Sequence, residues 1–233
     1  MNTNRILAIA LAASCAALPA AWADQPKRPV VVELFTSEGC SSCPPADALL
    51  TDLANKRHDV LPLAFHITYW NSLGWTDPFS FDAATKRQEG YARISSAGGV
   101  YTPQMVIDGT DDAVGSDRGD VLHAISAAAA KTNDPVPVQI TRDGKDAAVK
   151  VGLGEGAGRV WLIGYDSRHV TPVGRGENAG HTLVESNIVR SLTEMGDWSG
   201  AVLDLHHALP AGEHLAVLVQ ARDGRILGAA REQ

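Results

Sequence analysis

Apolar and polar positions follow two different patterns along this chain, and the change falls near Pro135. Before that residue, short apolar runs alternate with segments in which apolar residues recur every three or four positions, as on one face of a helix. After it, apolar residues recur every second position, as in strands that bury one face. The pattern predicts an α+β fold, with an α/β domain over residues 24–133 and an antiparallel β-sandwich-like domain over residues 134–233.

The first part of the chain predicts strands and helices in alternation. Residues 30–35 form a Val-rich run with the length of a strand buried on both faces. Residues 60–67 indicate a second strand, in which Pro62 belongs to an edge or irregular position. A short third strand turns at Asp108 and Gly109, because Asp-Gly favours a hairpin. Helices are expected over residues 44–56, 81–95 and 121–130.

The second part of the chain predicts strands alone. They are expected over residues 136–140, 147–153, 160–165, 182–192, 201–206, 214–221 and 225–230. The one irregular stretch is glycine-rich, residues 174–181, and its composition suits an exposed loop.

The N-terminus has the pattern of a cleaved secretory signal over residues 1–23. Arg5 precedes an apolar run, and small residues flank Trp22 up to Ala23. The run is too short for a membrane span, and no later segment reaches the required length. Cleavage near Ala23 predicts a periplasmic or secreted protein, and it removes Cys15.

Cleavage would leave Cys40 and Cys43 as the two cysteines of the mature chain. In an oxidising compartment, a single C-x-x-C pair closes too short a loop to constrain the unfolded chain much, so we expect it to serve reactivity. The formal net charge of −7 gives no positive surface for nucleic acid or anionic lipid.

The dithiol follows the Val-rich strand and stands at the start of a helix, because Pro44 and Pro45 suit a first helical turn. Free N–H groups and the helix dipole favour a thiolate there, which predicts Cys40 as the exposed nucleophile and Cys43 as the resolving thiol. Two other interpretations stay open, an inert disulfide and half of a metal site. A zinc site needs a second Cys/His pair, which the mature sequence lacks, so no metal and no cofactor are predicted.

The segments GCSSCPP, after the strand, and YTPQMVIDG, before the hairpin, resemble the thioredoxin superfamily. The resemblance implies a thioredoxin-like first domain in which Pro103 is a cis-proline facing the dithiol. It also implies that Thr102, with Tyr101 beside it, contacts the substrate. The aromatic-rich connection over residues 68–79 forms either a small aromatic core or a wall that faces the substrate.

Together with GRGENAGHTL, the strand and dithiol segment also resembles a secreted bacterial family catalogued as "domain of unknown function 1223", over nearly the whole mature chain. That family implies a fold and no activity. Thioredoxins carry a buried acid six positions before the first cysteine, where this chain has Leu34. Glu33 lies one position off, on the opposite face of the strand, and is either a proton relay or a salt-bridge partner.

These observations predict thiol–disulfide exchange with protein or small-thiol disulfide substrates, in a direction that the sequence does not fix. The glycine-rich loop either is simply solvated or folds back so that Arg175 or His181 adds positive charge near Cys40. The alternatives are a periplasmic copper-binding protein that uses the cysteines with His66 or Met105, and an interaction module with a structural disulfide.

Overall fold

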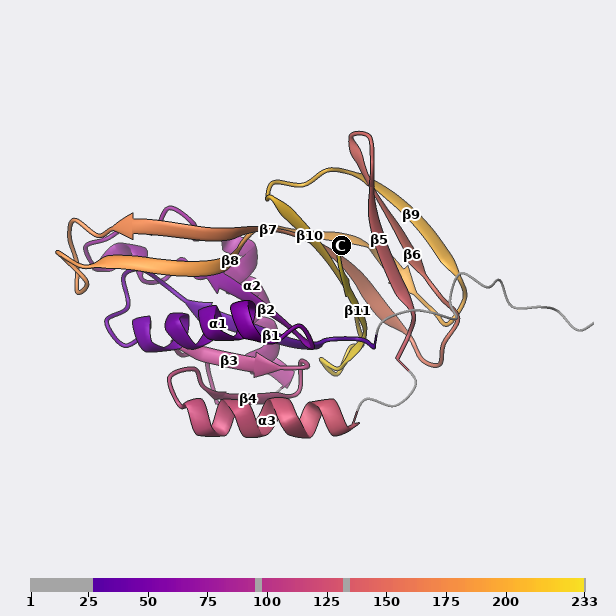
Figure 1. Ribbon diagram of the computed structural model, residues 1–233, viewed down its shortest axis with the longest axis horizontal. Helices are drawn as coiled ribbons and strands as arrows, with labels where there is room; N and C mark the ends of the chain where they lie inside the picture. The colour runs from indigo at the N-terminus through magenta and orange to yellow at the C-terminus, as the bar shows by residue number, and fades with distance from the viewer. Residues whose placement is uncertain (1–26, 95–97, 132–134, 233) are drawn as a thin grey trace, which may run out of the picture.

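The computed structural model describes residues 27–94, 98–131 and 135–232 (Figure 1). The expected signal segment, residues 1–23, lies outside the described residues. The elements follow in this order: β1 (Val30–Thr36), α1 (Pro44–Lys56), β2 (Val60–His66), α2 (Asp82–Ile94), β3 (Gln104–Ile107), β4 (Asp111–Val114), α3 (Arg118–Lys131), β5 (Val138–Asp143), β6 (Asp146–Val151), β7 (Gly158–Pro172), β8 (Thr182–Trp198), β9 (Leu203–Ala208), β10 (His214–Gln220) and β11 (Ile226–Arg231).

Two sheets organise these elements. The larger has eight strands in the order β11-β10-β7-β8-β2-β1-β3-β4, and the smaller has three in the order β5-β6-β9. The pairs β1–β2 and β2–β8 are parallel, whereas the other pairs are antiparallel. The α+β prediction is confirmed. The large sheet takes strands from both sides of the expected domain boundary, next to which residues 132–134 are not described, so the division into domains stays a prediction.

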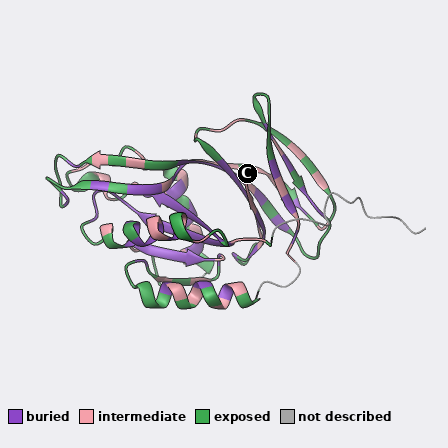
Figure 2. Cartoon of the chain, in the orientation of Figure 1, coloured by how far each residue is buried: buried purple, intermediate pink, exposed green. Residues whose placement is uncertain are grey.

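The core of the first part forms on both faces of β1, as its uninterrupted apolar run predicts. One face, with Val32 and Leu34, packs against α1 and α3. The other face, with Val31 and Phe35, packs against α2 and against strands of the second part. Figure 2 shows these central strands as buried throughout. The smaller sheet closes a third core against β7 and β10 around Trp198.

Pro62 lies not at an edge of the sheet but at a position of irregular pairing, the second of the two positions that the sequence predicts. It lies inside β2, paired with Val32 of β1 and with every neighbouring strand residue buried. The carbonyl oxygen of Pro62 accepts a hydrogen bond from the Asn187 side chain, at 2.8 Å, on the side of β8. The missing N–H of Pro62 faces the same side, where β2 and β8 share the single ladder pair Ala64–Ile188. The interior strand tolerates the proline because β8 leaves that position unpaired.

The three helices appear where the apolar periodicity predicts them. α3 begins at Arg118, three residues before the expected Val121, because the Asp117 carboxylate accepts the N–H of Asp120 at 3.1 Å and caps the first turn. No helix among the described residues is long and apolar enough to cross a bilayer.

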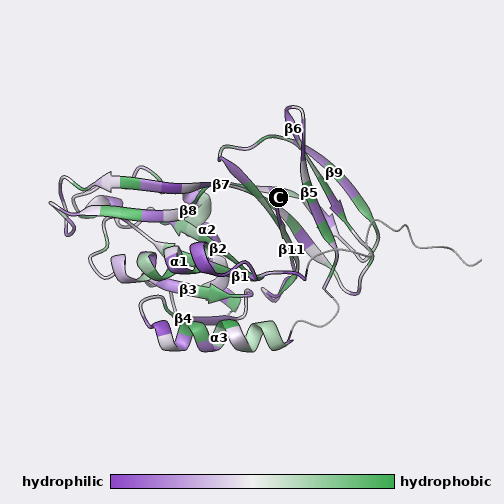
Figure 3. Cartoon of the chain, viewed as in Figure 1, coloured by the Kyte–Doolittle hydropathy of each residue, from purple (hydrophilic) through white to green (hydrophobic). Residues whose placement is uncertain are grey.

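The β7–β8 hairpin is longer than the sequence pattern predicts. Its outer part, residues 167–187, which we call the arm, extends beyond the other C-terminal strands and runs alongside α1 (Figure 1). Figure 3 shows that the arm mixes hydrophobic and hydrophilic residues. The Thr51 hydroxyl of α1 donates to the Ser186 hydroxyl of β8 at 3.1 Å. The C-terminal strands therefore reach the end of the sheet where the dithiol lies.

Candidate functional site

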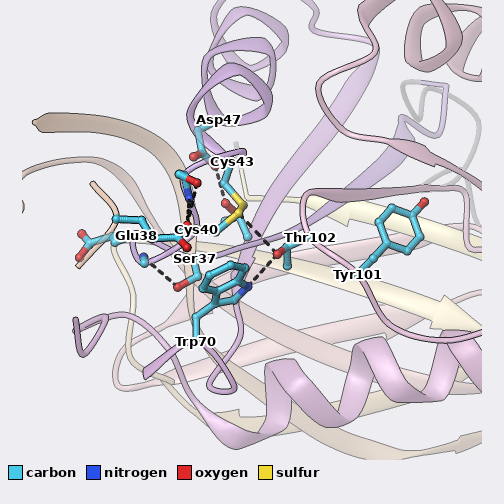
Figure 4. Close-up of a disulfide and its surroundings, with 12 residues drawn as sticks. Ser37, Glu38, Cys40, Cys43, Asp47, Trp70, Tyr101 and Thr102 are labelled. Carbon is cyan, nitrogen blue, oxygen red and sulfur yellow. Dashed lines mark hydrogen bonds between the residues drawn. A yellow bond between two sulfur atoms is a disulfide. The ribbon is translucent and has the colours of Figure 1, made fainter. Parts of the chain in front are cut away.

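Cys40 and Cys43 form a disulfide between β1 and α1 (Figure 4). Cys43 is the N-cap residue of α1, and its carbonyl oxygen accepts the N–H of Ala46 at 2.8 Å and of Asp47 at 3.1 Å. Pro44 follows at the first helical position, where its missing N–H costs nothing. The disulfide therefore stands at a helix N-terminus, as the sequence predicts.

Both cysteines are buried, with exposed fractions of 1% for Cys40 and 0% for Cys43. The expectation that Cys40 is exposed is therefore wrong for the oxidised protein. Trp70 and Thr102 lie beside the disulfide in Figure 4, and the tip of the arm lies against its loop. The sequence motif fixes the helix start, but these covering groups come from distant segments.

The Thr102–Pro103 peptide bond is cis, which confirms the expectation drawn from the resemblance. The Thr102 hydroxyl lies 3.5 Å from Sγ of Cys40 and accepts a hydrogen bond from the Trp70 indole N–H at 2.8 Å. Tyr101 points away from the disulfide in Figure 4, and its hydroxyl donates to Asp112 at 2.7 Å. Thr102 and Pro103 thus belong to the surroundings of the dithiol, while the Tyr101 side chain is held by the β3–β4 hairpin.

The glycine-rich loop folds back onto the dithiol segment, as the second interpretation of that loop expects, but through Glu177 and Asn178 rather than through Arg175 or His181. The Asn178 side chain donates to the carbonyl oxygens of Glu38 at 2.8 Å and of Cys40 at 3.0 Å. The Glu177 carboxylate accepts the Ser41 N–H at 3.2 Å and the Ser41 hydroxyl at 2.7 Å. Glu177 and Asn178, which the sequence did not single out, make these contacts.

Arg175 and His181, the two residues expected to add positive charge, lie on the same loop with exposed side chains. Gly176 brings the loop close to the aromatic connection, because a Cβ there would lie 3.1 Å from Cβ of Trp75 and its φ is +79°. The Trp75 indole in turn donates to Glu38 at 2.7 Å. The aromatic connection therefore forms part of the wall that joins the arm to the dithiol loop.

Glu33 is fully buried on the face of β1 opposite α1, where it pairs with the guanidinium of Arg87. The Tyr91 hydroxyl also donates a hydrogen bond to Glu33, at 2.6 Å. The same hydroxyl accepts a hydrogen bond from the Gln220 side-chain amide, at 2.9 Å. This arrangement supports the salt-bridge interpretation of Glu33. The ion pair ties β1 to α2 and to β10.

A second buried polar group, unrecognised in the sequence, lies on the inner side of the dithiol loop. Its members are ionisable, come from separate segments and are each at most 5% exposed: Glu38, Asp47, His66, Asp77 and Glu185. The His66 ring contacts Asp77 through Nδ1 at 2.7 Å and approaches Glu185 through Nε2 at 3.7 Å. The Asp47 carboxylate accepts the Thr36 hydroxyl at 2.9 Å. We call this group the acid–histidine cluster.

Burial shapes the proton affinities of this cluster. It raises the pKa of Asp47 to about 7 and that of Glu185 to about 8, and it also raises the pKa of Glu38. Burial alone would lower the pKa of His66, but the carboxylates of Asp77 and Glu185 outweigh it and raise that pKa to about 10. The pKa of Asp77 is lowered despite its burial, because His66 lies against it. His66 and Asp77 therefore form an ion pair, while Asp47 and Glu185 titrate near neutrality.

The candidate copper ligands are not gathered around the dithiol. Met105 is buried in the core between β1, α1 and α3. His66 belongs to the acid–histidine cluster, where its ring contacts Asp77. Within the part of the chain that the structure describes, no three His, Cys, Asp or Glu side chains are placed to hold a metal ion.

Among the comparisons with known proteins, one names a family, and that family's description gives no activity. The model of the family described as "Protein of unknown function (DUF1223)" matches residues 31–220. An Agrobacterium tumefaciens protein solved by X-ray crystallography is similar, with 33% identity and a TM-score of 0.75 over 89% of this chain and 95% of that one. HBP35 of Porphyromonas gingivalis shares the fold at 14% identity, with a TM-score of 0.57 over 88% of this chain and 75% of that one. A search of curated proteins found no match.

Proposed function

The chain belongs to the DUF1223 family of proteins of unknown function, and since that description assigns no activity, we propose from the site that it exchanges thiols and disulfides through Cys40 and Cys43. The observation that carries the proposal is the position of this disulfide at a helix N-terminus, beside the cis bond of Thr102 and Pro103. A disulfide that served only as a staple would need neither the helix start nor the Thr102 hydroxyl next to its first sulfur.

In the proposed reaction, the Cys40 thiolate attacks a substrate disulfide and forms a mixed disulfide, which Cys43 then resolves. The helix N-terminus supports this assignment because its free N–H groups favour a thiolate. The Thr102 hydroxyl, 3.5 Å from Sγ of Cys40, supports it as a hydrogen-bond donor to that thiolate. The reverse sequence would oxidise a substrate dithiol with the same residues.

The arm tip and the Trp70 side chain, which lie over the disulfide, would restrict which substrates reach it. Because both cysteines are buried in the oxidised protein, a substrate reaches Cys40 only when the arm tip or the Trp70 side chain moves aside. We assign Glu177 and Asn178 to this restriction, with Arg175 and His181 as accessory residues on the same loop. The substrates are thiols or disulfides of small molecules or proteins, met in the periplasm or outside the cell if residues 1–23 act as a secretory signal.

The test is equilibration with glutathione. The protein is incubated in buffers that range from reduced to oxidised glutathione, quenched with an alkylating agent, and its alkylated cysteines are counted by mass. We expect reversible conversion between the disulfide and dithiol forms with one midpoint, and no conversion in a Cys40→Ser/Cys43→Ser variant. A disulfide that stays closed across the whole range for many hours would reject exchange and favour a purely structural bond.

A further inference from the structure

A groove lies between α2 and the C-terminal strands of the large sheet. The helix packs against one face of these strands but covers it only in part, so Trp161 of β7 and Leu192 of β8 remain partly exposed beside it. They form the floor of the groove, while α2 forms one wall and the end of β10 with the following turn forms the other. The groove has a volume of about 500 Å³, which is within the range of small-molecule sites. Its lining residues are distinct from those around the disulfide.

The helix presents a glycine, Gly90, to the middle of this groove. Glycine destabilises a helix interior relative to alanine. Apart from the helix's own backbone, a Cβ at Gly90 would meet one atom of the described residues within 4 Å, Nη2 of Arg93 at 3.7 Å. Close packing therefore does not require glycine here, and the missing side chain keeps the groove open.

One end of the groove is basic. A Cβ at Gly224 would lie 2.7 Å from Cδ1 of Ile94, the last residue of α2, so this end of the helix meets the turn after β10. Arg93 precedes Ile94 on the helix, and Arg222 belongs to the turn. Both line the groove, so two guanidinium groups stand at the end where the helix and the turn meet.

The opposite end of the groove is apolar. Ala83 stands in the first turn of α2, about 16 Å along the helix axis from the last residue. On the sheet, Leu192 lies opposite Ile163, which is four residues beyond Arg159 along β7. The groove is therefore elongated, and it runs from an apolar end to a basic one.

The cations around the groove differ in whether an acid neutralises them. Arg87 pairs with Glu33, and its guanidinium lies over the Trp161 ring at 5.6 Å. Arg159 pairs with two acids of β8, at 3.0 Å and 3.5 Å. The part of the chain that the structure describes offers no ion pair to the other three, which are Lys86, Arg93 and Arg222. In a chain with a formal net charge of −7, such a group favours an anionic ligand at this site.

We propose that this groove binds a long-chain carboxylate of the fatty-acid class, with its chain along α2 over Trp161 and Leu192 and its carboxylate at Arg93 and Arg222. A guanidinium group binds a carboxylate through two parallel N–H groups, and the apolar floor accepts the chain. A compact anion would leave most of the floor uncovered. A peptide would bring backbone N–H and C=O groups that an apolar floor leaves without partners.

The test is isothermal titration calorimetry of the protein with dodecanoate, below the concentration at which it forms micelles. Decanoate and dodecyltrimethylammonium are compared under the same conditions. We expect one site for dodecanoate, and binding of decanoate should be weaker by about threefold to tenfold because two fewer methylene groups are buried. Dodecyltrimethylammonium, which has the same chain and a positive head, should show no saturable binding.

Gly90→Leu tests the position of the chain. The leucine side chain fills the middle of the groove, so affinity for dodecanoate should fall by about tenfold or more. Stability should not fall, because leucine has the higher helix propensity. Gly119→Leu makes the same change on α3, away from the groove, and should bind as the wild type does.

Arg93→Gln/Arg222→Gln tests the position of the carboxylate. Affinity for dodecanoate should fall by about tenfold, while the ratio between dodecanoate and decanoate stays as in the wild type, because the chain is still buried. The control is Arg225→Gln, which changes a cation of the same turn that pairs with Asp223 and does not line the groove.

Unchanged binding in Gly90→Leu, or equal affinity for dodecanoate and dodecyltrimethylammonium, would overturn the proposal. Binding of naphthoate without binding of dodecanoate would overturn it in favour of a compact aromatic anion. If dodecanoate does not bind and Gly90→Leu instead lowers the molecular mass measured by light scattering, the groove joins two copies of the chain and the proposal is wrong. Each of these results leaves the exchange proposed for Cys40 and Cys43 untouched, since the glutathione experiment tests it separately.

Discussion

The Asn178 side chain donates one hydrogen bond to the carbonyl oxygen of Cys40, at 3.0 Å, and a second to that of Glu38, at 2.8 Å. These contacts fasten the tip of the arm to the backbone that carries the first cysteine. Because the cysteines are also buried, the surroundings of Cys40 include a segment that lies far away in sequence. The C-terminal strands are thus part of the dithiol site.

Cys43→Ser should trap mixed disulfides through Cys40, whereas Cys40→Ser should trap few or none. The asymmetry follows from geometry, since Cys43 is the N-cap residue inside the first turn and Cys40 is the sulfur that the Thr102 hydroxyl approaches. Trapping is measured by mass spectrometry of each variant after incubation with oxidised glutathione. Equal trapping by both variants would speak against an ordered two-cysteine mechanism.

Asn178→Ala should expose Cys40 in the reduced protein. The change removes two hydrogen bonds, one to the Glu38 carbonyl oxygen and one to that of Cys40, which keeps its bond from the Cys43 N–H at 3.2 Å. We expect a cost of about 1–3 kcal/mol to the closed position of the arm tip. Alkylation of Cys40 by iodoacetamide should become several-fold faster. Thr182→Ala serves as the control, because it changes an exposed residue that borders the same loop. A similar acceleration in the control, or none in Asn178→Ala, would mean that the loop contacts do not limit access.

The local part of the site could be predicted from the sequence because local rules govern it. The Val-rich run, the two cysteines and the prolines at 44 and 45 specify a strand, a loop and a helix start within 20 residues. The cis bond before Pro103 followed from a resemblance. The turn at Asp108 and Gly109 also formed as its dipeptide predicts, with positive φ at both residues.

The rest of the site depends on pairing between distant segments, which periodicity does not reveal. Pro62 could lie inside a strand only because β8 leaves it unpaired, and nothing near Pro62 in the sequence indicates β8. Likewise, Asp47, His66 and Glu185 have ordinary neighbours in sequence, and only the fold gathers them. The sequence around Asn178 gives a weak indication of its role, because asparagine side chains among glycines in a loop often form hydrogen bonds with the backbone.

Arg87→Met should destabilise the protein by about 3–5 kcal/mol, because it leaves the fully buried Glu33 without its cation. The double variant Glu33→Gln/Arg87→Met should lose less than the single one, since no unpaired charge remains. Urea unfolding measures the free energy of unfolding of both variants, and an unchanged m value shows that the mutations change stability and not the surface exposed on unfolding. Arg93→Met, an exposed position on the same helix, should stay within about 0.5 kcal/mol of the wild type. If Arg87→Met loses as little stability as Arg93→Met, the ion pair between Glu33 and Arg87 contributes little to folding.

The stability of the protein should depend on pH through Asp47, because burial raises the pKa of that carboxyl to about 7. In an unfolded chain an aspartate titrates near pH 4, so between about pH 4 and about pH 7 the folded protein holds a proton that the unfolded chain has released. The stabilisation associated with that proton is complete below about pH 4 and is lost as the pH rises through about 7, at up to about 1.4 kcal/mol per pH unit.

Asp47→Asn should remove this slope, and the asparagine Oδ1 can still accept the Thr36 hydroxyl. Urea unfolding at about pH 4.5 and about pH 6.5 compares the two proteins within the window of Asp47, below the range where the raised pKa of His66 adds its own loss of stability. The wild type should lose more stability across the window than the variant, because every other titrating group is common to both. If the two proteins lose equal stability, Asp47 is already charged in the folded state across this window, and burial does not raise its pKa.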